Sequence, residues 1–354
     1  TLFTGMEITG CYQFRVTRNS DLYVDEEEME NLMRALEGQL AASRYGAAVR
    51  LEVAYSCPNE LTRYLLDVFE LDEDDMYLAD GPINLNRMMT VYSESERSDL
   101  KYPPFTSGVQ KCLRNNSDIF SLLQKQDVLL HHPFDSFGIV LELIKVAAKD
   151  PAVVAIKMTL YRTTLDSKIM NYLIEAASTG KEVTVLVELR ARFDEAANIS
   201  LANRLQEAGA HVVYGIVGFK THCKLTLIVR QEQRQLTRYV HLGTGNYHPE
   251  TARTYTDYGL LTTNEEIAND VHHIFLQLTS MMQTPPLKKL VQAPFQLQEN
   301  LLAFIDREAT NARAGGSGHI IAKLNALVEP EIIRALYKAS SAGVMVDLIV
   351  RGMC

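Results

Sequence analysis

The sequence predicts an α/β fold in which a strand–helix–strand unit occurs twice, preceded by an α+β region. From Asp135 onward, helical patterns alternate with short runs of β-branched residues, an order typical of a sheet with helices on both faces. One stretch of this alternation recurs near the end of the chain, and such repeats indicate duplication. We therefore expect an α+β head domain at 1–125, a first α/β domain at 126–312 and the start of a second copy at 313–354.

The head domain is expected to combine strands with amphipathic helices. Strands are predicted at 9–16 and 47–54, and helices at 26–42 and 59–70. In the helix at 26–42, apolar residues from Met29 to Leu40 follow the i, i+3, i+4 spacing of one helix face. We interpret this face as part of a domain core.

The first α/β domain is expected to follow a regular order. Asp135 is the predicted N-cap of a helix that ends before Pro151, and Asn264 is the predicted N-cap of the last helix. Between them, strands are predicted at 153–160, 183–189, 211–216, 220–230, 238–242 and 257–262, and helices at 169–179 and 195–208. Ligands bind at strand ends in folds of this class.

The duplicated unit is recognised by matching apolar and glycine positions. Ile169, Leu173, Gly180 and Val183 of the first copy correspond to Ile332, Leu336, Gly343 and Val346 of the second. In the first copy His222 follows Gly180 by 42 positions, and the same spacing from Gly343 predicts a second histidine about 30 residues beyond Cys354. Because the chain also begins at Thr1 rather than at a methionine, we expect a fragment that lacks both ends of its parent protein.

A His-x-Lys motif lies in the strand predicted at 220–230. Side chains alternate between the two faces of a strand, so His222 and Lys224 share one face while Cys223 points toward the core. Imidazole can form a covalent intermediate, and a neighbouring ammonium group lowers the cost of bringing up a phosphate. Because this spacing also arises by chance, the surrounding residues decide its interpretation.

Arginines and glycines follow three of the predicted strands. Arg162 follows the strand at 153–160, Arg190 and Arg192 follow the strand at 183–189, and Gly243, Gly245 and Asn246 follow the strand at 238–242. Guanidinium groups bind phosphate oxygens in a bidentate way, and glycines allow backbone N–H groups to approach a phosphate. We therefore predict a phosphate site here, with a surface ion pair to Asp194 or Glu195 as the alternative for Arg192.

Charge and composition limit the classes of partner. Residues 1–100 carry 8 Lys and Arg against 20 Asp and Glu, whereas residues 157–257 carry 13 against 10. We therefore expect a polyanion to bind the second stretch rather than the first. The five cysteines are scattered and no apolar run of about 18 residues occurs, so a reducing cytoplasm is the simplest location.

These motifs and the segments around them resemble the polyphosphate kinase family, whose members transfer phosphate between ATP and inorganic polyphosphate. The resemblance rests on residues 155–162, 187–195 and 241–258 beside the His-x-Lys motif, and it covers nearly the whole chain. It implies a duplicated catalytic half that is similar to the phospholipase D fold, in which two His-x-Lys motifs face each other. The chain departs from the phospholipase D pattern because Val229 stands where that pattern has an aspartate.

The resemblance implies roles for single residues. His222 would take the γ-phosphate of ATP and pass it to polyphosphate in a reversible ping-pong reaction. Arg162 and Arg192 match the arginines of the family's magnesium and phosphate site, and we interpret them as binding the phosphates that carry Mg²⁺. Tyr255 matches the position that contacts the base or ribose of ATP. Asp257 is our own hypothesis for the carboxylate that fixes the tautomer of His222.

Two other classes of function stay open. A phospholipase D-like phosphodiesterase or nuclease would use the same histidine and lysine, and a noncatalytic polyanion-binding module would keep the arginines without covalent chemistry. The resemblance implies ATP, ADP and polyphosphate as partners, no nucleic acid, and a homo-oligomer; family members can also associate with the inner face of a membrane. It further implies that the chain by itself can be inactive, because the second catalytic histidine lies outside it.

Overall fold

The computed structural model describes residues 5, 7–19, 46–114, 118–161, 167–188, 195–215, 219–280 and 285–354. The chain divides into two compact units, Thr1–Thr284 and Pro285–Cys354. The helix predicted at 26–42 lies outside the described residues, as do Arg162, Arg190 and Arg192. Within the described ranges, no helix is both long enough and apolar enough to cross a membrane.

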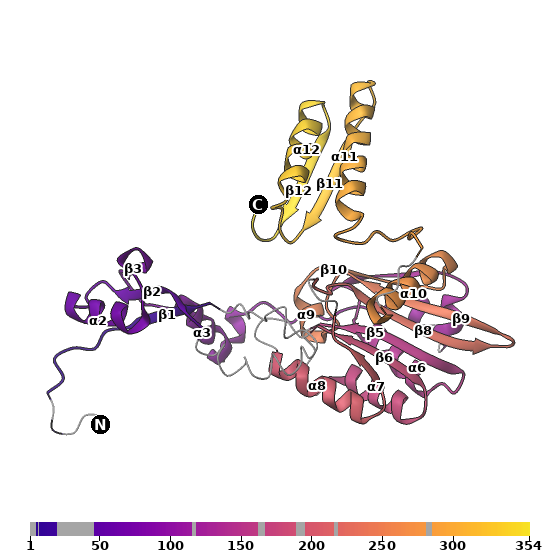
Figure 1. Ribbon diagram of the computed structural model, residues 1–354, viewed down its shortest axis with the longest axis horizontal. Helices are drawn as coiled ribbons and strands as arrows, with labels where there is room; N and C mark the ends of the chain where they lie inside the picture. Colours follow the sequence, from indigo (N-terminus) through magenta and orange to yellow (C-terminus); the bar gives the residue numbers. More distant parts are fainter. Residues whose placement is uncertain are drawn as a thin grey trace. The chain divides into compact units, whose positions relative to one another are not determined.

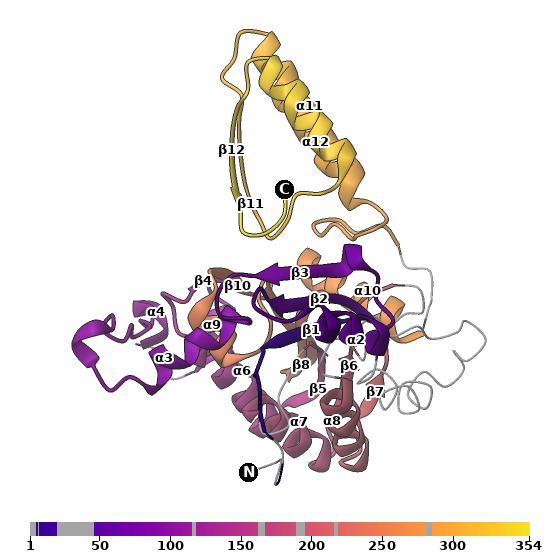
Figure 2. The same cartoon turned by 90° about the vertical axis from the view of Figure 1, so that its left-hand side faces the viewer.

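A three-stranded sheet forms the first part of the chain, in the order β1–β2–β3 (Figure 2). β1 (Phe14–Arg18) runs antiparallel to β2 (Ala48–Ala54), and β2 runs parallel to β3 (Met76–Ala79). Its core consists of apolar residues of β2 and of α2 (Asn59–Phe69), which confirms the predicted α+β character. The short elements that precede and follow β3 are η2 (Glu73–Asp75), η3 (Leu85–Met88), α3 (Met89–Glu94), η4 (Ser98–Leu100), α4 (Lys111–Arg114) and α5 (Ile119–Leu123).

The central element is a seven-stranded mixed sheet in the order β4–β10–β9–β8–β5–β6–β7. Its strands are β4 (Val128–His132), β5 (Val153–Leu160), β6 (Glu182–Val187), β7 (His211–Val213), β8 (Lys224–Glu232), β9 (Gln235–Gly243) and β10 (Asp257–Thr262). β5, β6 and β7 run parallel, and every other neighbouring pair is antiparallel. The α/β class predicted from the alternation of elements is therefore confirmed.

Helices cover both faces of this sheet (Figure 1). α6 (Gly138–Lys149), α7 (Lys168–Ser178) and α8 (Glu195–Glu207) lie on one face, and α10 (Glu265–Ser280) lies on the other. In α7 the buried Ile169, Leu173 and Ala176 repeat at helical spacing, so one stripe of the helix packs into the main core. The short α9 (Pro249–Thr254) follows β9.

Two predicted boundaries differ from the structure for local reasons. β8 begins at Lys224 instead of residue 220, because the Thr159 hydroxyl donates to the Cys223 carbonyl and accepts from the Leu225 N–H. The prediction of Asp135 as N-cap was wrong: its carboxylate accepts from a backbone N–H in β4, and α6 begins only at Gly138. The predicted cap at Asn264 is confirmed, since its side chain accepts from the N–H of Ile267 at 3.1 Å.

The second unit repeats the strand–helix–strand arrangement. β11 (His319–Leu324) pairs in parallel with β12 (Met345–Val350), and α12 (Pro330–Ser341) connects them, as α7 connects the parallel β5 and β6. α11 (Leu297–Arg313) packs beside α12 on one side of the two strands (Figure 2). The sequence repeat therefore corresponds to one structural unit that occurs twice.

Candidate active site

Four strand ends meet at one edge of the seven-stranded sheet. β5 ends at Leu160, β6 at Val187 and β9 at Gly243, whereas the antiparallel β8 begins at this edge with Lys224. Lys224 pairs directly with Gly243 in the β8–β9 register. The His-x-Lys motif and the glycine turn are therefore neighbours, as expected for residues at the ends of adjacent strands.

Tyr161 brings His222 and Lys224 together. The ring of the exposed His222 meets the Tyr161 ring edge to face, with centroids 5.2 Å apart and planes at 83°. The Lys224 ammonium group lies 5.1 Å from the centroid of the same ring and donates to the His222 carbonyl at 2.6 Å. The imidazole is thus accessible to a substrate while its backbone is fixed by the lysine.

The segment before β8 is also held by a buried carboxylate. Glu188 directly follows β6, is 5% exposed, and accepts from the Thr221 N–H at 2.8 Å. Together with the bond from Thr159 to the Cys223 carbonyl, this contact fixes the backbone on both sides of His222. β5, which pairs with β8, and β6, the next strand beyond β5, therefore determine where the histidine stands.

Burial changes the acid–base properties of Lys224. Its side chain is 4% exposed, and this burial lowers its pKa to about 8, although the nearby Cys223 and Asp257 act in the opposite direction. Burial raises the pKa of the Cys223 thiol to about 11, so this cysteine is a neutral thiol at pH 7. Cys223 is partly exposed and is not among the buried residues of the core, so its predicted core position is not confirmed.

The glycine turn requires glycine for steric reasons. A Cβ on Gly245 would overlap the Asp257 carboxylate, and one on Gly243 would lie 3.2 Å from Cε1 of His241. Neither glycine has a positive φ, so close approach rather than backbone conformation demands them. Among the described residues, the N–H groups of Gly245 and Asn246 have no hydrogen-bond acceptor, which leaves two donors at the turn.

Asp257 lies beside this turn at the start of β10. Its carboxylate accepts from the Thr244 hydroxyl at 2.8 Å, and the same hydroxyl accepts from the Tyr258 N–H at 2.9 Å. The carboxylate also attracts the Lys224 ammonium group electrostatically. Asp257 therefore links the glycine turn to the lysine, and its predicted bond to His222 stays a prediction.

A buried histidine, His241, packs against the glycine turn. His241 is 3% exposed, and its Nδ1 accepts from the Tyr247 hydroxyl at 2.8 Å, which in turn accepts from the Thr226 hydroxyl at 2.9 Å. Burial lowers the pKa of His241 to about 3, so its imidazole is neutral. Because its ring touches Gly243 and its bond holds Tyr247, His241 connects the residues on either side of the turn.

Of the remaining predicted site residues, the structure describes Tyr255 but not the three arginines. Tyr255 directly follows α9 and is 42% exposed, a position open to a ligand. Arg162, Arg190 and Arg192 lie outside the described ranges.

Sequence reasoning missed Tyr161 and Glu188. Tyr161 and Glu188 each come directly after a strand whose end was predicted within two residues. Their position at a strand end was therefore the sequence signal that could have identified them. Their roles depend on contacts with the segment before β8, which is distant in sequence. Local patterns could not reveal those contacts.

Metal ligation by side chains has little basis in the described residues. Within those ranges, no group of three or more His, Cys, Asp or Glu side chains is arranged to hold a metal ion. Among the described carboxylates at this sheet edge, Asp257 accepts from Thr244 and Glu188 accepts from Thr221. The predicted magnesium ion therefore stays a prediction, which the described side chains do not test.

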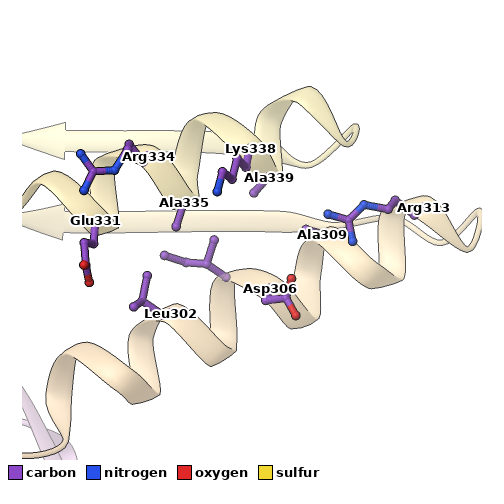
Figure 3. Close-up of a pocket in the computed structure, with 10 residues that line it drawn as sticks. Leu302, Asp306, Ala309, Arg313, Glu331, Arg334, Ala335, Lys338 and Ala339 are labelled. Atoms are coloured by element: carbon purple, nitrogen blue, oxygen red, sulfur yellow. The ribbon is translucent and has the colours of Figure 1, made fainter.

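A separate pocket lies in the second unit, between α11 and α12 (Figure 3). It has a volume of about 410 Å³, and side chains of both charges project into it, including Asp306 and Arg313 from α11 and Arg334 from α12. It contains none of the residues that the sequence singled out. We therefore assign the candidate active site to the sheet edge in the first unit.

Fold and site together define an α/β protein that presents a histidine and a buried lysine beside a glycine turn. Three models of one family match the chain in order: the polyphosphate kinase middle domain at residues 1–91, its C-terminal domain 1 at 118–284 and its C-terminal domain 2 at 290–354. The chain therefore belongs to the polyphosphate kinase family.

Individual relatives agree with this assignment. The chain is 55% identical over 353 residues to a polyphosphate kinase of Pseudomonas aeruginosa and 56% identical over 353 residues to one of Xylella fastidiosa. All of the chain is matched, and it spans about half the length of these relatives, 51% and 50%. A crystal structure of polyphosphate kinase from Porphyromonas gingivalis matches all of the chain and 51% of its own, with a TM-score of 0.81 and 30% identity.

Proposed function

We propose that the protein containing this chain transfers the γ-phosphate of ATP to inorganic polyphosphate through a phosphohistidine on His222. The observation that carries this proposal is an exposed imidazole next to a buried ammonium group, beside a turn whose two N–H donors have no acceptor among the described residues. Membership of the polyphosphate kinase family supports the choice of ATP and polyphosphate as substrates.

The first step forms a bond between an imidazole nitrogen of His222 and the γ-phosphorus of ATP. The bond from that phosphorus to the bridging oxygen breaks, and ADP leaves with the electron pair. The Lys224 ammonium group and the N–H groups of Gly245 and Asn246 offset the negative charge on the transferred phosphoryl group. Arg162 and Arg192 are proposed to bind the same phosphates.

The second step returns the imidazole to its starting state. A terminal oxygen of the polyphosphate chain attacks the phosphorus, the phosphorus–nitrogen bond breaks, and the chain grows by one phosphate. Both the phosphoimidazole and the phosphoanhydride are high-energy species, so the transfer is reversible. Mg²⁺ would bind to the phosphate oxygens and reduce the negative charge of the phosphates further.

A labelling experiment tests the covalent step. The protein is incubated with γ-³²P-ATP and Mg²⁺, and the label is tested for the acid lability and base stability of a phosphohistidine. We expect label on the wild type and none on His222→Ala, because only His222 combines exposure with the adjacent lysine. His211→Ala is the matched control, since this exposed imidazole lies on β7 and outside the proposed machinery.

The outcomes separate the classes of function. Label that survives His222→Ala, or that His211→Ala removes, contradicts the assignment of the nucleophile. A folded wild type that never labels contradicts the covalent mechanism and favours a polyanion-binding module. Cleavage of a phosphodiester without ATP would instead favour the phosphodiesterase alternative.

A further inference from the structure

A cavity of about 770 Å³ lies beside the glycine turn. It is lined by the segment 105–107 and by residues at the starts of α6, α7 and α9. His248, one of its lining residues, follows Asn246 of the turn by two positions. None of the roles assigned above uses this cavity.

The cavity and Lys224 lie on the same face and at the same end of the sheet. Thr226 donates to Tyr247, and Tyr247 belongs to the core beneath α6 and α7. Because side chains of a strand alternate, Lys224 faces the same side as Thr226. α6 and α7 follow β4 and β5, so both begin at the edge that carries His222.

Three side chains that line the cavity accept hydrogen bonds from backbone N–H groups. Ser136 Oγ accepts from Gly138 at 3.1 Å, and Ser167 Oγ accepts from Met170 at 3.2 Å. His248 Nδ1 accepts from the Thr251 N–H at 3.3 Å. Each serine Oγ accepts one of these bonds, and its hydroxyl hydrogen can donate to another group. A neutral His248 whose Nδ1 accepts carries its hydrogen on Nε2, where it can also donate. The cavity therefore offers donors to an acceptor-rich ligand.

The charge of the lining favours an anion. Among the described lining residues, Lys168 and Arg253 contribute positive charge, and Glu250 contributes a negative charge that lies 3.7 Å from Arg253. The amino ends of α6 and α7, helices of 12 and 11 residues, add a favourable dipole. Phosphate oxygens accept hydrogen bonds and carry negative charge, so they match both properties.

We propose that this cavity binds the phosphate chain of the inorganic polyphosphate acceptor, away from the phosphate that is transferred. The inference rests on the proposed function, because it needs an acceptor chain that ends near His222. Each of the two lining phenylalanines contacts another ring, Phe105 that of Phe134 and Phe137 that of His132. The hydrogen-bond donors come from three separate segments of the lining, which suits an extended phosphate chain.

Substitutions at Ser167 test the cavity without removing the helix cap. Asp and Asn are both good N-cap residues, so Ser167→Asp and Ser167→Asn keep the acceptor for the Met170 N–H. Only Asn keeps a donor, whereas Asp adds a negative charge facing the ligand. Binding of a polyphosphate of defined length is measured by calorimetry on the whole protein, with ATP titrated separately. Ser136→Asp and Ser136→Asn repeat the comparison on α6.

We expect Ser167→Asp to weaken polyphosphate binding by at least about tenfold, and Ser167→Asn to stay within about threefold of wild type. ATP affinity should remain unchanged in both variants. The proposal is overturned if both Asp variants bind polyphosphate as the wild type does, or if ATP binding weakens while polyphosphate binding does not. Wild-type labelling with γ-³²P-ATP reports separately on the proposed function, so its failure is distinguishable from that of the cavity.

Discussion

The two strand–helix–strand units share one sequence pattern and differ in burial. Leu173 of α7 is fully buried, whereas Leu336, the corresponding residue of α12, retains 8% exposure. The contrast is larger in the strands: β6 is buried in all but its first residue, and none of the six residues of β12 is buried. The pattern therefore defines the unit, and the number of neighbouring strands decides how deeply it is buried.

This difference also decides what the end of each unit can do. β6 lies inside a seven-stranded sheet, so Glu188 at its end reaches the segment that carries His222. Among the described strands β12 pairs with β11 alone, and Arg351 at its end bonds the side chain of Asn325, in the loop after β11, at 2.9 Å. Within the described residues, β6 therefore helps to organise a site across several strands, whereas the end of β12 is bonded to the neighbouring loop.

The largest expected contrast is the cost of removing a core leucine. Leu173→Ala should lower the free energy of unfolding by about 4 kcal/mol, and Leu336→Ala by about 2 kcal/mol, because the cavity in the larger core relaxes less. Urea titration combined with hydrogen exchange assigns each loss to its unit. Equal losses would show that strand number does not control the packing of the helix.

A smaller contrast concerns lysines on corresponding sheets. Lys224 of β8 is buried and its pKa is lowered to about 8 from 10.5, whereas Lys323 of β11 is exposed. Between pH 8 and 10.5 the unfolded chain binds more protons at Lys224 than the folded chain does, so stability should rise with pH in this window. Over the same window kcat/KM for phosphate transfer should fall up to about tenfold per pH unit, because the ammonium charge is lost.

Matched variants isolate this effect. Lys224→Met should remove the rise in stability between pH 8 and 10.5, while Lys323→Met should leave it intact, as measured by urea titration at several pH values. Lys224→Arg should move the fall in kcat/KM to higher pH, since arginine stays protonated. A rise in stability that persists in Lys224→Met would show that another group causes it.

The smallest expected effect is the same in both units. Gly180 and Gly343 follow α7 and α12 with φ of +87° and +96°, and a Cβ on either would meet no atom within 4 Å. Gly180→Ala and Gly343→Ala should therefore each cost about 1 kcal/mol, because the strain is local to the backbone. Thermal unfolding measures both. A cost at Gly180 that is several times larger would mean that burial, and not backbone conformation, controls this position.

Sequence patterns predicted the elements best where the determinants are local. β5 and β10 have the predicted bounds, and α8 is within one residue of its prediction, because apolar periodicity and capping residues act over a few positions. The start of β8 was predicted four residues too early, since the Thr159 side chain from another strand replaces its first ladder bonds. Asp135 failed as a cap because its carboxylate bonds the backbone of β4.

The sequence predicted several residues of the candidate site but not the contacts that hold them in place. His222, Lys224 and the glycine turn were recognised because histidine, lysine and glycine have distinctive chemistry near strand ends. The reason for Gly245 was not visible, since it depends on the Asp257 carboxylate from another strand. Tyr161 and Glu188 were missed for the same reason: their partners lie 61 and 33 positions away.

By itself, the sequence determined the α/β class, the repeated unit and the residues that carry the proposed chemistry. These follow from side-chain type and from periodicity, which are properties of neighbouring positions. Only the tertiary structure decided that Lys224 is buried opposite Gly243, that Tyr161 stands against His222, and that one copy of the repeat is enclosed. Strand order and register bring distant residues together, and no local pattern encodes which strands become neighbours.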